Sequence, residues 1–466
     1  MAVHTKHPVS IPPAAPLREK TGHLLLRGWC VVVLFFGMSA VGWVNAFGAI
    51  STGVAGVASV MVSIIVWAAL RPPLQVRRLP WYALGFVVWA GASLLWSQWP
   101  MATAMTWSLL AATTLQGLFI AAVLTWRELV RAIASALKWV LASSLVFELW
   151  VSLVVRAPVL PGFIPSTENT DPAEYWSQNT LFEAGRIQGY FGHANLLAPL
   201  ALLGIIVFAI RLASNAPRKV LLGVWIAVSA FVFIRSGSAT ATVAAAAVAV
   251  VLITILLMRR AGAPGARTRF YLGFAVVAIG GLSALWVFRM PLLETLGRGA
   301  DLAGREAIWA SVAERAAEHP LIGWGYSTPW LAGVGRFDGW IVTHSESAIQ
   351  AHNIWLDVSL QLGAVGVVMI SLTYVAMVWR SWFFAVDRPR WDLRNDRPYS
   401  PLSLLPSLLG ALLLVQGLAE STPLLLWGWM LLIALTAKIK QTPHIGVGPT
   451  EQTLAIERGE RIVLAP

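Results

Sequence analysis

Long apolar stretches, repeated along nearly the whole chain, constrain this sequence more than any other feature. A helix that crosses a bilayer needs about 20 mostly apolar residues. Twelve stretches qualify, namely 28–47, 51–70, 80–97, 102–125, 132–155, 193–210, 220–235, 239–258, 270–288, 354–379, 401–418 and 423–437. Only 12% of the residues are charged, about half the share found in a soluble domain. The sequence therefore predicts an all-α polytopic membrane protein with about 12 transmembrane helices.

Basic residues sort to one side of these stretches. With the N-terminus in the cytoplasm, the inner segments hold 25 Lys and Arg residues and the outer segments hold 8, the bias expected for membrane proteins. We expect 1–27 to be a cytoplasmic N-terminal tail, 28–437 a multi-span membrane domain, and 438–466 a cytoplasmic C-terminal tail. The net charge of +12 does not cluster on a polar surface, so we expect no nucleic-acid partner.

Two outer loops, 156–190 and 289–353, are too long to be simple turns. Any chemistry is therefore expected on the outer face. Within the second loop, 303–318 has the pattern of an amphipathic helix. Its apolar stripe consists of Ile308, Val312 and Ala316.

Three arginines on the outer side are candidates for binding an anion: Arg186, Arg235 and Arg305. A guanidinium group stays charged and binds phosphate oxygens through two parallel hydrogen bonds. Arg305 also falls in the first turn of the expected 303–318 helix, where free backbone N–H groups attract anions. These arginines suit a phosphorylated lipid headgroup. The alternative for each is an interfacial side chain or a surface ion pair.

His352 is the candidate for proton transfer. It precedes Asn353 and the start of an expected span, where the positive end of a helix favours a neutral imidazole that can accept a proton. A histidine at a membrane interface is otherwise a hydrogen-bonded structural residue. His344 is a second possibility, and Asp357, one turn beyond Asn353, could orient a neighbour or pair with an arginine.

Several kinds of site are not indicated. The single cysteine, Cys30, cannot form an intramolecular disulfide or a cysteine-based metal site. The sequence has no Walker loop, no dinucleotide-binding glycine motif and no zinc-ligand spacing. No Asp-x-Asp pair lies on an outer loop. We therefore expect no metal and no cofactor.

Five short motifs together resemble the core of the O-antigen ligase and polymerase superfamily. They are Arg186…Gly189-Tyr-Phe-Gly-His193-Ala-Asn195, Arg235-Ser-Gly-Ser-Ala-Thr240, Gly304-Arg-Glu-Ala-Ile-Trp309, Glu318-His-Pro-Leu-Ile-Gly-Trp-Gly325 and Ala351-His-Asn-Ile-Trp-Leu-Asp-Val-Ser-Leu-Gln-Leu-Gly-Ala-Val-Gly366. Each motif alone is weak evidence for the resemblance. The set is specific because the five motifs occur in the right order and all lie on the predicted outer side of the membrane. The resemblance covers roughly 80–435, and the spacing is most similar to that of exopolysaccharide polymerases.

The resemblance implies a glycosyltransferase on the outer face of the bacterial cytoplasmic membrane. Its donor would be an undecaprenyl-pyrophosphate-linked oligosaccharide, its acceptor a glycan or a lipid, and a chain-length regulator is a candidate partner in the bilayer. Arg186, Arg235 and Arg305 would hold the pyrophosphate and His352 would be the general base. The supporting residues would be His193, Asn195, His344, Asn353 and Asp357.

Three functions stay open at this point. The leading one is an exopolysaccharide or O-antigen polymerase that inverts the anomeric centre without a metal. A ligase that moves finished glycan onto a lipid A core or a protein is the alternative. A flippase or other transporter of lipid-linked oligosaccharide is a third. It is disfavoured because the unusual charges lie mainly on one side and no internal repeat is present.

Overall fold

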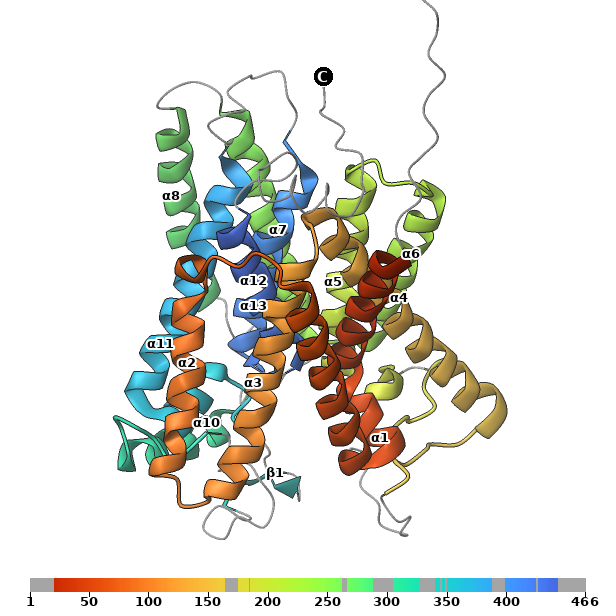
Figure 1. Cartoon of the computed structure of the whole chain (residues 1–466), viewed down its shortest axis with the longest axis vertical. Helices are drawn as coiled ribbons and strands as arrows, with labels where there is room; N and C mark the ends of the chain where they lie inside the picture. The colour runs from red at the N-terminus through yellow and green to blue at the C-terminus, as the bar shows by residue number, and fades with distance from the viewer. Residues whose placement is uncertain are drawn as a thin grey trace, which may run out of the picture.

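A computed structural model shows a bundle of helices that run mostly along one axis (Figure 1). It describes residues 21–163, 175–183, 185–261, 266–287, 305–326, 340–343, 346–347, 350–387, 399–424 and 426–442. The α-helices are α1 (Thr21–Leu70), α2 (Trp81–Ala92), α3 (Pro100–Val123), α4 (Trp126–Trp150), α5 (Ala194–Ala213), α6 (Lys219–Ser236), α7 (Ala239–Arg260), α8 (Ala266–Val287), α10 (Arg305–Glu318), α11 (Ile354–Val386), α12 (Leu405–Gly417) and α13 (Leu426–Gln441).

Short elements complete the described part of the chain. They are η1 (Val76–Arg78), η2 (Ser93–Leu95), the π-turn η3 (Val151–Val155), η5 (Gly189–Phe191), η8 (Pro401–Leu404) and η9 (Thr422–Leu424). The strands β1 (Val342–Thr343) and β2 (Glu346–Ser347) pair antiparallel, with Val342 opposite Ser347. They do not alter the fold class, and the expected all-α architecture is confirmed.

Among the residues that the structure describes, seven helices are long and apolar enough to cross a membrane: α1, α3, α4 with its π-turn, α5, α6, α7 and α11. Helices α2 and α12, with the short turns beside them, form shorter apolar stretches. Each of the twelve stretches marked in the sequence overlaps a helix, and the first two overlap α1, which breaks at Gly48. A multi-pass membrane protein is thus confirmed, while the count of twelve crossings stays a prediction.

Helix α13 lies in the middle of the bundle and is buried along almost its whole length. It packs along α3, while α5 packs along α6 and α7 along α12. Lys438 near its end is 1% exposed and donates to the carbonyls of Leu124 (2.5 Å) and Ala121 (3.4 Å) at the end of α3. A cation is favourable there, because the carbonyls at a helix C-terminus carry partial negative charge. The first residues of the expected 438–466 tail are therefore helical and packed.

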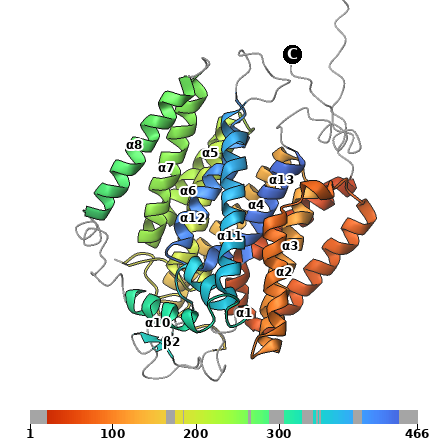
Figure 2. The ribbon, with the colours of Figure 1, turned by 90° about the vertical axis from the view of Figure 1, so that its left-hand side faces the viewer.

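Helices α5, α7 and α11 begin at the end of the bundle where α10 lies (Figure 2). A side chain caps the first turn of each. His193 Nδ1 accepts from the backbone N–H of Asn195 (3.2 Å), Ser238 Oγ from that of Ala241 (3.3 Å), and Asn353 Oδ1 from that of Trp355 (2.9 Å). Capping satisfies backbone donors that have no partner within the helix. This end of the bundle, called the loop end below, gathers most of the predicted site residues.

Helix α11 breaks at Gly363, and residues 320–325 lie in the break. On one side, the N–H groups of Trp324 and Gly325 donate to the carbonyls of Leu360 and Gln361 (3.0 and 2.9 Å). On the other side, Ala364 N–H donates to the carbonyl of Pro320 (2.8 Å). The broken turn therefore keeps its hydrogen bonds, as backbone buried within a membrane protein requires.

Only glycine suits the two closest points of this crossing. Gly363 has φ 63° and Gly323 has φ 68°, both in the left-handed region. An added Cβ would lie 2.3 Å from the backbone of Leu321 at Gly363, and 2.3 Å from the backbone of Gln361 at Gly323. The segment can cross the helix because neither residue has a side chain.

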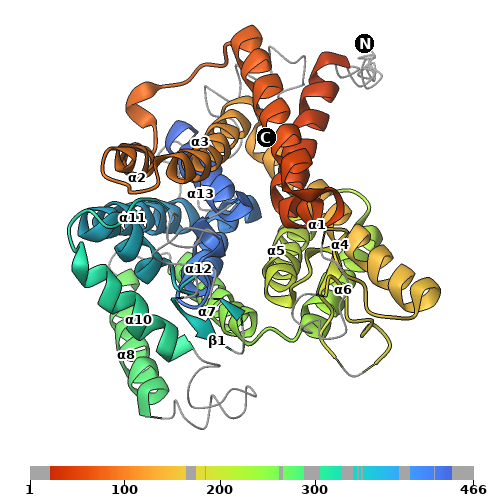
Figure 3. The ribbon, with the colours of Figure 1, turned by 90° about the horizontal axis from the view of Figure 1, so that it is seen from below.

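Helix α10 lies across the loop end beside the start of α11 (Figure 3). The expected stripe is confirmed, because Ile308, Val312 and Ala316 are its buried residues. They pack with Trp324 and Leu360 in a small core separate from the main one. This packing fixes the first residue of α10, Arg305, beside the ends of α11 and α12.

Candidate active site

Glu420, between α12 and η9, joins the residues of the cluster at the loop end. It is 2% exposed. Its Oε1 accepts from Arg305 Nη2 (2.8 Å) and Asn195 Nδ2 (3.0 Å). Its Oε2 lies 3.1 Å from His352 Nδ1. One carboxylate thus contacts three residues that were singled out in the sequence. They are Arg305 at the start of α10, Asn195 in α5 and His352 just before α11.

Arg186 extends this cluster on the side of α5. Its Nη2 donates to Asn195 Oδ1 (2.6 Å) and its Nε donates to the carbonyl of Ser236 (2.8 Å). The α6–α7 turn approaches closely because Gly237 has no side chain, and an added Cβ there would lie 3.3 Å from Arg186 Cγ. Arg186 is exposed, whereas the side chains of Arg305 and His352 are 12% and 26% exposed. The cluster is therefore exposed to solvent at Arg186 and buried at Glu420.

His352 is held in an unusual backbone conformation by its neighbours. Its φ is 52°, in the left-handed region that side chains other than glycine rarely adopt. The carbonyl of Ala351 accepts from Trp309 Nε1 (2.9 Å), and the N–H of Ala351 donates to Asp357 Oδ1 (3.2 Å). Ser421 donates from its hydroxyl to the other oxygen of Asp357. Asp357 thus contacts Ala351, the residue before His352, and Ser421, the residue after Glu420.

Asn353 and Gln350 add two more hydrogen bonds between the segment before α11 and the segment after α12. Asn353 caps α11 and donates from Nδ2 to the carbonyl of Leu418 (3.2 Å). Gln350 Oε1 accepts from the N–H of Ser421 (3.3 Å). Residues 350–353 are therefore hydrogen-bonded to the chain before Glu420, at Leu418, and after it, at Ser421. A strained φ held in place by surrounding contacts is common where a side chain must be aimed.

The charge of Glu420 is stabilised by its neighbours. Burial alone would raise the pKa of this carboxyl group, because burial disfavours a charged form. The hydrogen bond to His352 and the charges of His352, Arg305 and His193 act in the opposite direction and outweigh burial. The pKa of Glu420 is therefore lowered below its ordinary value. The carboxylate stays ionised and can only accept hydrogen bonds.

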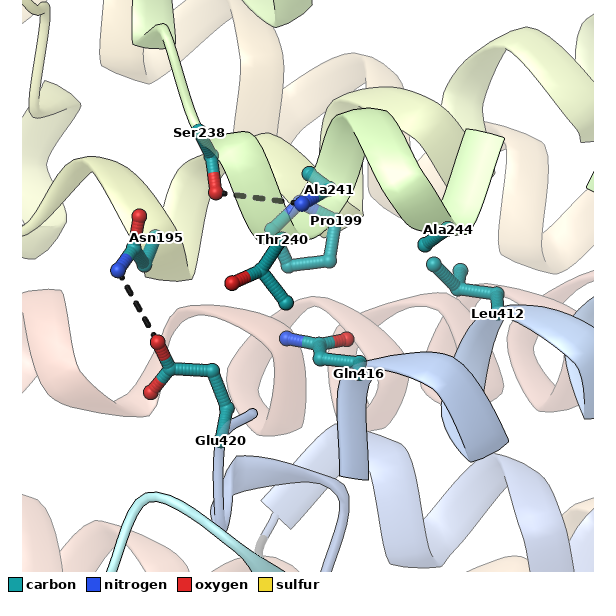
Figure 4. Close-up of a pocket in the computed structure, with 9 residues that line it drawn as sticks. All are labelled: Asn195, Pro199, Ser238, Thr240, Ala241, Ala244, Leu412, Gln416 and Glu420. Carbon is teal, nitrogen blue, oxygen red and sulfur yellow. Dashed lines mark hydrogen bonds between the residues drawn. The ribbon is translucent and has the colours of Figure 1, made fainter. Parts of the chain in front are cut away.

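A narrow pocket continues from Glu420 between α5, α7 and α12. Figure 4 shows Asn195 directed at Glu420 at one end of it, with Thr240 and Gln416 further along. Its lining is polar near Glu420 and becomes apolar deeper in the bundle, at Pro199, Ala244 and Leu412. The cluster thus lies where a polar surface meets the apolar interior.

Arg235 is not brought into this cluster, and His344 cannot be placed. Arg235 directs its Nη2 at the carbonyls of Thr180, Leu181 and Glu183 (2.6, 3.0 and 2.9 Å). Its role in binding pyrophosphate stays a prediction. His193 caps α5 and is exposed, and it lies close enough to the cluster for its charge to act on Glu420. His344 lies outside the described residues.

Glu420 was not among the residues singled out in the sequence, although a signal was present. It is the only acidic residue between 400 and 450, and it lies in the short outer connection between the last two expected spans. An ionisable residue at such a position is a functional candidate by itself. Within the described part of the chain, no group of three or more His, Cys, Asp or Glu residues could hold a metal ion.

Comparison with known proteins supports the resemblance seen in the motifs. A family model described as O-antigen ligase matches residues 222–371, which include Arg235, Arg305 and His352. The exopolysaccharide production protein ExoQ of Rhizobium meliloti (strain 1021) is 26% identical over 170 residues. That alignment covers 35% of this chain and 37% of ExoQ. The chain is therefore similar to O-antigen ligases over residues 222–371 and to an exopolysaccharide production protein over about a third of its length, in agreement with the order of its motifs.

Proposed function

We propose that this chain is a membrane glycosyltransferase that uses an undecaprenyl-pyrophosphate-linked glycan as donor and acts as an exopolysaccharide or O-antigen polymerase. The observation that carries the proposal is the contact between buried Glu420, His352 and Arg305 at the loop end. We further propose that this end faces the periplasm and that both termini are cytoplasmic, as the charge bias predicts.

His352 is the general base in this proposal. Glu420 is ionised and only accepts hydrogen bonds, so the contact at Nδ1 places the ring proton on that atom. Nε2 is then the nitrogen with a lone pair. A carboxylate that fixes a histidine in this tautomer and stabilises the imidazolium formed later is the arrangement of hydrolase triads.

Arg305 and Arg186 supply positive charge for the leaving group. Each guanidinium has five N–H donors, so Arg305 can bind Glu420 through Nη2 and also bind a phosphate oxygen. In the proposed step, the acceptor hydroxyl oxygen forms a bond to the anomeric carbon and its proton passes to His352 Nε2. The bond from the anomeric carbon to the pyrophosphate oxygen breaks, and the polyprenyl pyrophosphate leaves with the electron pair. An in-line attack of this kind inverts the anomeric centre.

Transfer of finished glycan to a lipid A core or a protein is the second candidate. The family description, O-antigen ligase, favours it, whereas the match to a protein named for exopolysaccharide production favours a polymerase. The reaction at the anomeric carbon is the same in both, and they differ only in the acceptor.

Purified protein with lipid-linked repeat units tests the proposal, and we expect products that grow by one repeat at a time. Activity should persist in excess chelator, because protein charge stabilises the leaving pyrophosphate. Single transfer only to a lipid A core or protein acceptor would identify a ligase. Movement of the donor across the bilayer without a new glycosidic bond would contradict both, and loss in chelator restored by Mg²⁺ would contradict the metal-independent step.

Arg305→Lys is expected to lower turnover by about 10²-fold, the typical effect of removing one donor that stabilises developing charge. Lysine keeps the charge, but it cannot contact Glu420 and a phosphate through one planar group. Arg315→Lys is the matched control. It lies on the same helix and pairs with Glu318 three residues later (3.0 Å). Normal turnover in Arg305→Lys, or unfolding as its main effect in a thermal melt, would argue against phosphate binding.

A further inference from the structure

A second buried glutamate, Glu148, lies at the loop end of α4, outside the cluster around Glu420. It is 1% exposed. Its Oε1 accepts from the backbone N–H groups of Gln188 (2.9 Å) and Gly189 (2.7 Å). Its Oε2 accepts from the hydroxyl of Ser177 (2.9 Å). One side chain therefore binds the loop before α5 at two places.

The backbone that Glu148 binds lies between two residues of the cluster. Gln188 follows Arg186 by two positions, and Asn195 follows six residues after Gly189. The N–H of Ile187 donates to the carbonyl of Arg235 (3.0 Å). Three consecutive N–H groups, at 187, 188 and 189, thus have acceptors from α6 and α4. Such complete pairing fixes the direction in which the chain leaves Arg186.

The fit at Gly189 is an independent observation of the same docking. Gly189 has φ 58°, and an added Cβ would lie 2.9 Å from both Cβ and Oγ of Ser144, one turn before Glu148 on α4. At Gly189 the loop therefore contacts α4 through its backbone. Two residues later, the carbonyl of Phe191 accepts a hydrogen bond from Asn45 Nδ2 of α1 (3.0 Å).

We infer that Glu148 is a positioning residue of the active site, which holds the backbone of residues 188–189 against α4 and thereby keeps Arg186 in contact with Asn195 and, through it, with Glu420. This inference rests on the proposed function for its effect on activity. The docking of residues 188–189 on α4 can be measured without substrate.

Glu148→Ala is expected to lower turnover by about 10- to 100-fold, since misplacement of a positioning group by 1 Å can cost 10²-fold. Glu148→Gln should restore most of the activity. Its amide oxygen can replace Oε1 toward the two N–H groups, and its amide nitrogen can donate to the Ser177 hydroxyl, which can also accept. Gly189→Ala should repeat the defect of Glu148→Ala through a steric cause.

Hydrogen exchange at residues 187–192 provides the readout that is independent of activity. Protection should fall in Glu148→Ala and Gly189→Ala and stay near the wild-type level in Glu148→Gln. Glu128→Ala is the matched control, because Glu128 lies on the same helix, is also 1% exposed, and caps the opposite end. It should lower thermal stability while the exchange of 187–192 stays unchanged.

The outcomes separate the two proposals. Loss of protection in Glu148→Ala, with no glycosyl transfer by any variant including wild type, would contradict the proposed function and leave the docking role supported. Wild-type protection and turnover in Glu148→Ala would overturn the inference. So would a defect in Glu148→Gln as large as that in Glu148→Ala, since the conservative change keeps the acceptor.

Discussion

His352→Ala is expected to fold, to bind the lipid-linked donor and to lose transfer activity by about 10²–10⁴-fold, the usual cost of removing a general base. The ring is partly exposed and its backbone is held by neighbours on both sides, so folding should not depend on the imidazole. Turnover and donor binding by purified variant and wild type, together with thermal melts, measure the three expectations.

The pH dependence should identify the base. Because the base must be unprotonated, activity should fall toward acidic pH, and that acid limb should be absent from the residual activity of His352→Ala. Glu420 stays ionised across this limb, because its pKa is lowered. His344→Ala serves as the control and should be much milder. An inactive His344→Ala beside an active His352→Ala would transfer the role of base to His344.

Glu420→Gln is expected to be comparably damaging, for a reason that follows from which oxygen contacts which donor. Oε1 faces two donors, Arg305 Nη2 and Asn195 Nδ2, and Oε2 faces His352 Nδ1. The single amide oxygen of glutamine will satisfy the two donors, which leaves its NH₂ group facing His352. Nδ1 must then accept, the proton moves to Nε2, and the base is blocked. Fixing a catalytic histidine in the wrong tautomer costs about 10⁴-fold in serine proteases.

Thermal stability separates this effect from loss of structure. Every polar group around residue 420 keeps a partner in Glu420→Gln, so the melting temperature should stay close to that of wild type. Glu318→Gln is the control for removing an acidic group at the same end of the bundle, because it lies on α10 away from the cluster. Turnover in Glu420→Gln equal to that in Glu318→Gln would exclude the tautomer mechanism.

Much of the fold could be predicted because it depends on local pattern. The apolar stretches correspond to helices, and the buried face of α10 is the stripe expected from 3.6-residue periodicity. Asn353 caps α11, as asparagine before a helix commonly does. These features depend on residues a few positions apart, so a single sequence contains them.

The rest depends on pairs that are distant in sequence. Glu420 meets His352 across 68 positions and Arg305 across 115, and no local pattern encodes either distance. Arg235 was expected to bind an anion because arginine suits phosphate, yet backbone carbonyls of residues 180–183 occupy its Nη2. The motif residues around Gly323 and Gly363 were recognised as a family signature, but the crossing that explains them appears only in three dimensions.

The site is built from two parts of the fold. The outer part of α11 packs with α10 in their small shared core and against the 320–325 crossing, and these elements position Arg305 and His352. The other part, made of α5, the α6–α7 turn and the end of α12, positions Arg186, Asn195 and Glu420. Glu420 contacts both Arg305 and His352 where the two parts meet. A displacement of Glu420 would therefore change the hydrogen-bond partner of the histidine and the counter-charge of the arginine together, which makes the chemistry depend on how the helices pack at this point.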